Sequence, residues 1–221
     1  MKSEIILALD VDNFALVKYF VHKLYPQIKT FKVGMQLYTA IGPRVIKMIH
    51  QKGGEVFLDL KFLDIPNTVA KAVREAVRHN VKMLTLHICG GQEMLKAAVS
   101  AAKDEAKKSK AKKPLLIGVT VLTSQKTLSS QVFKLAKIGI ASGLDGVVCS
   151  AQEARSLRKI IKRKFVIVTP GIRPEGIDRN DQKRIATVSE AIKAGSNFLV
   201  IGRPILESDN PLQTVKSLKV R

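Results

Sequence analysis

The chain has 221 residues, 46% of them hydrophobic, and a formal net charge of +20, which is enough apolar content for one sizeable core. Its two cysteines, Cys89 and Cys149, argue against a disulfide-built secreted domain and predict two buried thiols in a cytoplasmic protein. No apolar run approaches the roughly 20 residues of a membrane span, and the chain does not open with a signal peptide.

Short apolar runs rich in β-branched residues alternate along the chain with amphipathic stretches of helical period. Helical spacing is clearest at Phe14, Val17, Val21 and Leu24, and again at Val69, Val73, Ala76 and Val77. The apolar runs are Ile5–Leu9, Thr30–Val33, Glu55–Leu60, Met83–Ile88, Leu115–Val121, Gly146–Cys149, Phe165–Thr169 and Asn197–Ile201. Strands that alternate with helices form βαβ units and a parallel sheet.

Eight such units predict an α/β fold, a single (β/α)8 TIM barrel that forms one domain over residues 1–221. The rival is a doubly wound open sheet, which would need a glycine-rich phosphate turn after an early strand, and residues 10–13 are not one. The chain starts almost at the first strand and ends soon after the eighth, so we also expect no fused second enzyme.

Charged residues lie on or at the ends of the first three predicted strands. Asp10 ends the first strand, Lys32 lies on the second, and Asp59 and Lys61 end the third. Side chains two positions apart on a strand share a face, so Asp59 and Lys61 should both point into the barrel mouth, where βα loops build active sites. A buried ion network stabilises a fold poorly, so the set favours a functional cluster; His87, at the end of the fourth strand, is a weaker candidate.

The loops after strands three, seven and eight add further candidates. Asp64 and the apolar Ile65 follow the third strand, and Pro66 suits the first turn of a helix. The segment 169–184 is long, polar and glycine-containing, so it could close as a lid. Barrels commonly hold phosphate with the loops after strands seven and eight, and Gly202 with Arg203 offers close backbone approach and a bidentate cation there.

Seven segments, in the same order, make the chain resemble the orotidine 5′-phosphate decarboxylase family over almost its whole length. They are LALD at 7–10, FKVGMQLY at 31–38, DLKFLDIPNT at 59–68, GVTVLTS at 118–124, TPGIR at 169–173, NDQKR at 180–184 and IGRPI at 201–205. The string at 59–68 is the most specific of them. The resemblance implies decarboxylation of orotidine 5′-phosphate to UMP and CO₂, the last step of de novo pyrimidine nucleotide synthesis, without metal or organic cofactor.

The resemblance also implies residue roles and a homodimer. Lys61 would donate a proton to the product carbanion, within a charge network of Lys32, Asp59, Lys61 and Asp64. Asp64 would come from the partner subunit, together with Ile65 and Thr68. Asp10 and Lys32 would hold the ribose hydroxyls. The remaining substrate contacts would be Thr123, Gln182, Arg173, Gly202 and Arg203, the last three around the phosphate.

The implied chemistry suits these residue types. Loss of CO₂ from the ring leaves a carbanion in the ring plane that the π system cannot delocalise, so electrostatic stabilisation must be a main contribution. Carboxylates beside Lys61 keep it charged.

Two rival functions stay open at this stage. Mg²⁺-dependent sugar-phosphate decarboxylases and hexulose-phosphate synthases resemble the chain in the Asp-x-Lys-x-x-Asp string, but they carry a carboxylate on the second strand where this chain has Lys32. A basic polyanion-binding protein is the other. The lysine-rich runs at 103–113 and 159–164 contain no aromatic residue for base stacking, so we expect no specific nucleic-acid partner.

Overall fold

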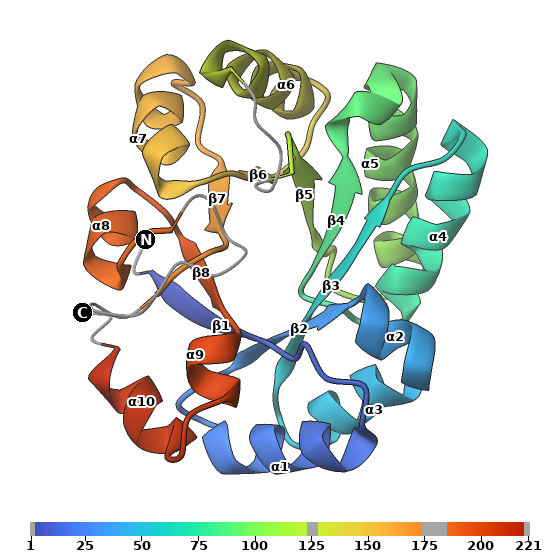
Figure 1. The fold of residues 1–221 in the computed structure, drawn as a ribbon. Helices are drawn as coiled ribbons and strands as arrows, with labels where there is room; N and C mark the ends of the chain where they lie inside the picture. Colours follow the sequence, from blue (N-terminus) through green and yellow to red (C-terminus); the bar gives the residue numbers. More distant parts are fainter. Residues whose placement is uncertain (1–2, 123–127, 174–184, 219–221) are drawn as a thin grey trace.

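The computed structural model describes residues 3–122, 128–173 and 185–218. Within these ranges, eight parallel strands close into a barrel in which each strand pairs with its chain neighbours and β8 pairs with β1 (Figure 1). The strands are β1 (Glu4–Ala8), β2 (Thr30–Gly34), β3 (Glu55–Phe62), β4 (Met83–His87), β5 (Leu115–Val119), β6 (Gly146–Val148), β7 (Val166–Thr169) and β8 (Phe198–Ile201). The predicted (β/α)8 fold is confirmed, and every predicted strand lies within two residues of its observed bounds.

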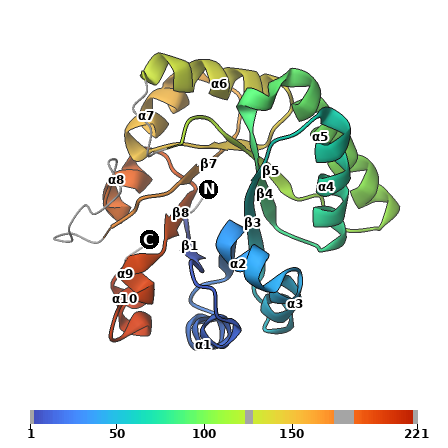
Figure 2. The same ribbon diagram turned by 45° about the vertical axis from the view of Figure 1, so that its right-hand side comes forward.

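Helices surround the barrel on all sides, as Figure 1 shows from one end and Figure 2 from an oblique direction. They are α1 (Phe14–Leu24), α2 (Met35–Ile41), α3 (Arg44–Gln51), α4 (Pro66–Arg78), α5 (Gly91–Lys108), α6 (Ser129–Ala141), α7 (Ala151–Ile160), α8 (Val188–Lys193), α9 (Arg203–Leu206) and α10 (Pro211–Ser217), with a 3-10 turn η1 (Ile88–Gly90). Pro66 takes the first position of α4, as predicted.

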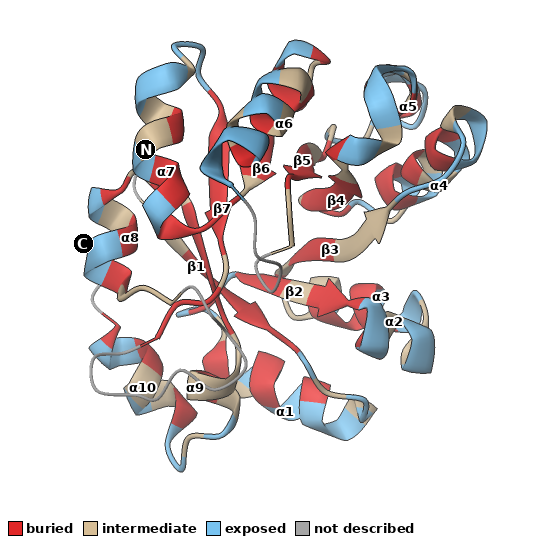
Figure 3. Ribbon diagram, turned by 45° about the horizontal axis from the view of Figure 1, so that its top comes forward, coloured by how far each residue is buried: buried red, intermediate tan, exposed pale blue. Residues whose placement is uncertain are grey.

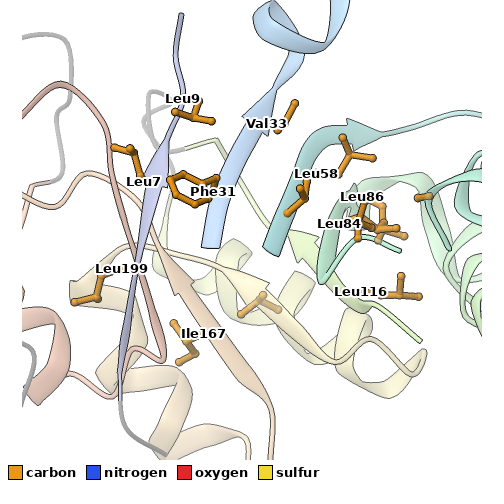
Figure 4. Packing of buried hydrophobic residues seen from close by; sticks show 14 of the residues in the cluster. Leu7, Leu9, Phe31, Val33, Leu58, Leu84, Leu86, Leu116, Ile167 and Leu199 are labelled. Carbon is orange, nitrogen blue, oxygen red and sulfur yellow. The ribbon is translucent and has the colours of Figure 1, made fainter. Parts of the chain in front are cut away.

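Two layers of apolar side chains hold the strands, one on each side of the sheet. Alternation along β1 sends Leu7 outward to the helices and Ile6 inward to the barrel axis. Figure 4 shows the outer layer, in which Leu7, Phe31 and Leu199 stand on neighbouring strands. Colouring by burial shows the same division, because the strands, apart from the carboxyl half of β3, and the inward helix faces are mostly buried, while the outward helix faces are exposed (Figure 3).

The predicted helical stripes face this outer layer. On α4, Val69, Val73, Ala76 and Val77 are all buried. On α1, Val17, Val21 and Leu24 are buried and Phe14 is partly buried. The side chain of Asn13 caps α1 by accepting a hydrogen bond from the Ala15 amide at 2.8 Å, which satisfies one of the free donors of the first turn.

A group of polar side chains occupies the amino-terminal end of the barrel. Lys82 Nζ donates to Glu4 Oε2 at 2.9 Å, to Thr30 Oγ1 at 2.8 Å and to Glu55 Oε2 at 2.7 Å. We call Glu4, Thr30, Glu55 and Lys82 the floor cluster. The Lys82 ammonium thus has an acceptor for each of its three donors, while the side chains of Glu4 and Glu55 are 34% and 44% exposed.

The two cysteines are free thiols with different surroundings. Cys149 is buried as predicted, and burial raises its pKa, as does the nearby Glu153. The prediction for Cys89 was wrong: it lies in the turn η1 beyond the end of β4, where the chain meets solvent, and it is exposed. Among the described helices, none combines the length and the apolar character needed to cross a bilayer.

Candidate active site

A pocket of about 240 Å³ opens at the carboxyl ends of the strands, where a parallel barrel gathers its βα loops. Its wall has three parts: charged residues from β1 to β3, apolar residues from β5 and β6, and two arginines after β7 and β8. The lining residues are Ala8, Asp10, Lys32, Phe57, Asp59, Lys61, Val119, Val121, Leu122, Val148, Val168, Pro170, Gly171, Arg173, Val200, Gly202 and Arg203. A ligand that combines an anionic group, an apolar face and polar groups would match these parts.

Four charges of alternating sign run along one side of the pocket. Lys32 Nζ lies 3.0 Å from Asp10 Oδ1 and 3.6 Å from Asp59 Oδ2, and Lys61 Nζ lies 3.0 Å from Asp59 Oδ1. We call Asp10, Lys32, Asp59 and Lys61 the charge row. The Lys32 and Asp59 side chains are each 12% exposed, against 55% for Asp10, so the middle of the row is desolvated and its ends meet solvent.

The backbone of β3 is distorted at the point where it presents this row. Leu58 pairs with Leu84 and Phe62 with Leu86, so three residues of β3 stand opposite one residue of β4, Thr85. Lys61 has a φ of +52°, which is uncommon for a residue with a side chain. Simple alternation therefore does not describe this turn, although Asp59 and Lys61 do reach the same pocket.

Burial and the surrounding charges shift the proton affinity of Asp59 and of the nearby His87. Burial alone would raise the pKa of Asp59, but Lys32, Lys61 and hydrogen bonds from Lys61 and Thr85 outweigh it, and the pKa lies below its ordinary value. The pKa of His87 is lowered by burial and by Lys61, against a smaller opposite effect of Asp59. Asp59 is therefore an anion and His87 is neutral at pH 7.

Two arginines with guanidinium groups suited to oxyanions line the part of the pocket that follows β7 and β8. Arg173 is 6% exposed, its Nη1 donates to the carbonyl of Ile172 at 3.1 Å, and its backbone N–H donates to Ala186 O at 3.0 Å. Arg203 begins α9 directly after Gly202. A Cβ atom at Gly202 would lie 3.3 Å from Asp10 Oδ2, so the glycine keeps the charge row and the phosphate-binding candidates close together.

Comparison with known proteins identifies the family. A sequence model described as "Orotidine 5'-phosphate decarboxylase / HUMPS family" matches residues 3–218. The chain belongs to this family. It is 49% identical to an orotidine 5′-phosphate decarboxylase of Pseudoalteromonas translucida, over 95% of this chain and 93% of the relative. It is 44% identical to one of Moorella thermoacetica, over 98% and 91%.

Solved structures agree with the sequence relatives. The crystal structure of orotidine 5′-phosphate decarboxylase from Lactobacillus acidophilus superposes with a TM-score of 0.86 at 34% identity, covering 98% of this chain and 97% of that one. The enzyme from Methanocaldococcus jannaschii, complexed with the inhibitor BMP, has a TM-score of 0.79 at 23% identity and shows the fold alone.

The structure brings together most of the residues proposed for this chain's site. All four members of the charge row, together with Arg173, Gly202 and Arg203, line one pocket. The proposed cross-subunit residues Asp64, Ile65 and Thr68 lie outside it and are exposed. Thr123 and Gln182 fall outside the described residues. His87 is half-buried and does not line the pocket.

Sequence reasoning missed two kinds of site residue. The apolar wall of Val119, Val121, Leu122 and Val148 was not named, although inward positions of predicted strands could have indicated it. Thr85, which contacts both Asp59 and Lys61, gave no signal, because its role depends on the register between β3 and β4. Over the described part of the chain, no three His, Cys, Asp or Glu residues gather as metal ligands.

Proposed function

We propose that the chain decarboxylates orotidine 5′-phosphate to UMP and CO₂, the last step of de novo UMP synthesis, without a cofactor. The observation that carries the proposal is the alternating charge row in the wall of a pocket that two arginines also line. Relatives at 44–49% identity over nearly the whole chain bear the same activity in their names.

Substrate binding would use the two ends of the pocket. Arg173 and Arg203, with the Gly202 backbone beside them, would hold the phosphate through charge-assisted hydrogen bonds. Asp10 and Lys32 would hold the ribose hydroxyls, and Thr123 and Gln182 are proposed as further substrate contacts. Phosphate binding is remote from the bond that breaks, so its free energy could be used to bring the ring against the charge row.

In the chemical step, the bond between C6 and the carboxylate breaks, CO₂ leaves and the electron pair stays on C6. The Lys61 ammonium then transfers a proton to C6, which gives UMP, and neutral Lys61 regains a proton from water. An ammonium about 4 Å from a unit negative charge stabilises it by about 4 kcal/mol at an effective dielectric constant of about 20. Asp59, bonded to Lys61 Nζ through both oxygens at 3.0 Å, keeps that lysine charged until the transfer.

We also propose that a homodimer completes the site, with Asp64, Ile65 and Thr68 contributed by the partner subunit. Large apolar side chains are exposed just after the carboxyl ends of β2 and β3. They are Met35 at the start of α2, at 57%, and Leu63 and Ile65 on the loop after β3, at 54% and 66%. A second copy that covered them would gain their burial and could bring its Asp64 toward Lys61. Mixing Lys61→Ala and Asp64→Ala chains tests this, because hybrid dimers with shared sites would each contain one intact site and regain activity. Activity that stays absent after mixing would contradict the shared site.

The Mg²⁺-dependent sugar-phosphate reactions of the same barrel group are the alternative. Lys32 argues against them, because its ammonium lies between Asp10 and Asp59, where a divalent cation would be repelled. The free state of the two cysteines fits a reducing compartment, and we propose that the protein acts in the cytoplasm.

The deciding experiment follows the ultraviolet loss of orotidine 5′-phosphate with and without EDTA. We expect turnover that EDTA does not change. Turnover that EDTA abolishes would favour the metal-dependent alternative. Absence of turnover, with tight and salt-sensitive binding to RNA, would favour a polyanion-binding protein.

A further inference from the structure

Thr85 lies behind the charge row rather than in the pocket wall. It is fully buried in the middle of β4 and is the one β4 residue opposite the widened part of β3. Its hydroxyl donates to Asp59 Oδ1 at 2.9 Å and accepts from the backbone N–H of Lys61, also at 2.9 Å. The side-chain oxygen of Thr85 therefore contacts both the Asp59 carboxylate and the backbone of Lys61, whose side chain carries the ammonium.

The direction of these two hydrogen bonds follows from the groups involved. An ionised carboxylate only accepts and a backbone N–H only donates, so the hydroxyl proton must point to Asp59 and the lone pair to Lys61. The register shift places Lys61 N–H opposite the Thr85 side chain, whose hydroxyl supplies its acceptor. The hydroxyl also supports the left-handed backbone of Lys61, which is unfavourable for a residue with a side chain.

We propose that Thr85 is a positioning residue, whose hydroxyl fixes the Asp59 carboxylate and the Lys61 backbone relative to each other so that the ammonium is aimed into the pocket. This inference rests on the proposed decarboxylase function, since it assigns Thr85 a role in that reaction. Thr85 does not line the pocket, so it acts through Asp59 and Lys61 and not on the substrate.

Loss of the hydroxyl should also change the proton affinity of Asp59. The charged and titratable groups around this carboxylate are Lys32 from β2, Lys61 on its own strand and His87 from β4, with Asp10 beyond Lys32. None of these is altered in a Thr85 variant. The Thr85 hydrogen bond lowers the pKa of Asp59, so its removal should raise that pKa and move the acid side of the activity profile to higher pH.

The test compares Thr85→Val, which keeps the shape and removes the hydroxyl, with Thr85→Ser, which keeps the hydroxyl and removes a methyl group. Thr30→Val is the matched control, since Thr30 is also a fully buried strand threonine, but its hydroxyl bonds within the floor cluster at the opposite end of the barrel. Should Thr85→Val fail to fold, Thr85→Ala against Thr85→Ser gives the same comparison. Steady-state decarboxylation, thermal unfolding and a carbon-13 NMR titration of the Asp59 carboxyl are measured for each.

We expect Thr85→Val to lower kcat roughly 10²-fold, as a misplacement of about 1 Å would, with KM nearly unchanged. The acid side of its profile and the Asp59 titration should both move to higher pH, and Thr85→Ser should restore all three. Thr30→Val should lose stability and keep kcat. A Thr85→Val variant that loses stability but keeps kcat and the Asp59 titration would overturn the proposal. A wild-type chain inactive on orotidine 5′-phosphate would count against the proposed function. The NMR titration needs no turnover, so it would still show whether Thr85 controls the Asp59 carboxyl.

Discussion

Replacement of Lys61 by alanine removes the ammonium proposed to stabilise and protonate the carbanion. The structure indicates that the fold should survive, because Asp59 keeps Lys32 at 3.6 Å and the hydroxyl of Thr85 at 2.9 Å. Alanine at φ +52° carries a backbone strain similar to that of lysine, so the turn is not relieved either. The loss of one charge-assisted hydrogen-bonded partner should cost about 2 kcal/mol of unfolding free energy.

The effect on the rate should be far larger than the effect on stability. Loss of about 4 kcal/mol of charge stabilisation corresponds to roughly 10³-fold in rate. Loss of the proton donor contributes roughly a further 10²–10⁴-fold. Lys61→Ala should therefore lower kcat roughly 10⁵-fold or more.

The measurement is ultraviolet loss of orotidine 5′-phosphate at saturating substrate, with circular dichroism to establish that the variant is folded. Lys107→Ala is the control, since Lys107 is an exposed lysine in the last turn of α5 and should leave kcat unchanged. A folded Lys61→Ala variant that retains a rate within tenfold of wild type would refute both the electrostatic and the proton-donor role.

Three further predictions concern the phosphate, the floor cluster and pH. Arg203→Ala should lower kcat/KM for orotidine 5′-phosphate roughly 10- to 10²-fold and leave the phosphate-free nucleoside unaffected, and an equal loss on both substrates would contradict the phosphate role. Lys82→Ala should lower the unfolding free energy by about 2 kcal/mol in urea titrations with kcat unchanged, and a variant as stable as wild type would show that the floor cluster contributes nothing net. The pKa of His87 is lowered below its ordinary 6.5, so the unfolded chain binds a proton there before the folded chain does, and stability should fall as pH drops below about 6.5. His87→Gln should make that fall shallower, and an unchanged slope would be evidence against it.

The fold could be predicted because its determinants are local. Each strand is an apolar run bounded by polar residues, and each helix repeats its apolar positions at a period that faces one side, as at Val69, Val73 and Val77 of α4. The chain then has few ways to bury every strand on both faces. Closure of the barrel between β1 and β8 follows from eight successive parallel pairings.

The charge row was predictable for the same reason, and the details of its geometry were not. That Asp10, Lys32, Asp59 and Lys61 meet follows from their places at the ends of adjacent parallel strands. The backbone turn at Lys61 and its contact with Thr85, which is 24 residues further along the chain, depend on a register shift between β3 and β4. Nothing in local periodicity encodes such a shift. The prediction that Asp59 and Lys61 share the pocket was therefore correct, although the strand does not follow the simple alternation on which it was based.

The exposed Cys89 marks a second limit. Cysteine is usually buried, and its place at a strand end suggested the core. Burial there depends on how the next segment turns, and the chain enters the short helix η1 instead of continuing the strand. The sequence pattern predicts whether a residue is buried only within a strand or helix, and not beyond the end of that element.

The barrel carries a partly buried lysine cluster at each end, and the partners of the two ammonium groups distinguish their roles. Lys82 Nζ donates its three hydrogen bonds to Glu4, Glu55 and Thr30, so it has no donor left for a ligand. It also lies 5.2 Å from the centre of the Phe198 ring. Lys61 Nζ, within the part of the chain that the structure describes, bonds to Asp59 and has donor capacity directed to the pocket. In the floor cluster, lysine and carboxylate side chains thus have a structural role, because all three donors of Lys82 are occupied. At the mouth, the Lys61 ammonium hydrogen-bonds to the carboxylate of Asp59, and its remaining partner would be the developing negative charge of the proposed substrate.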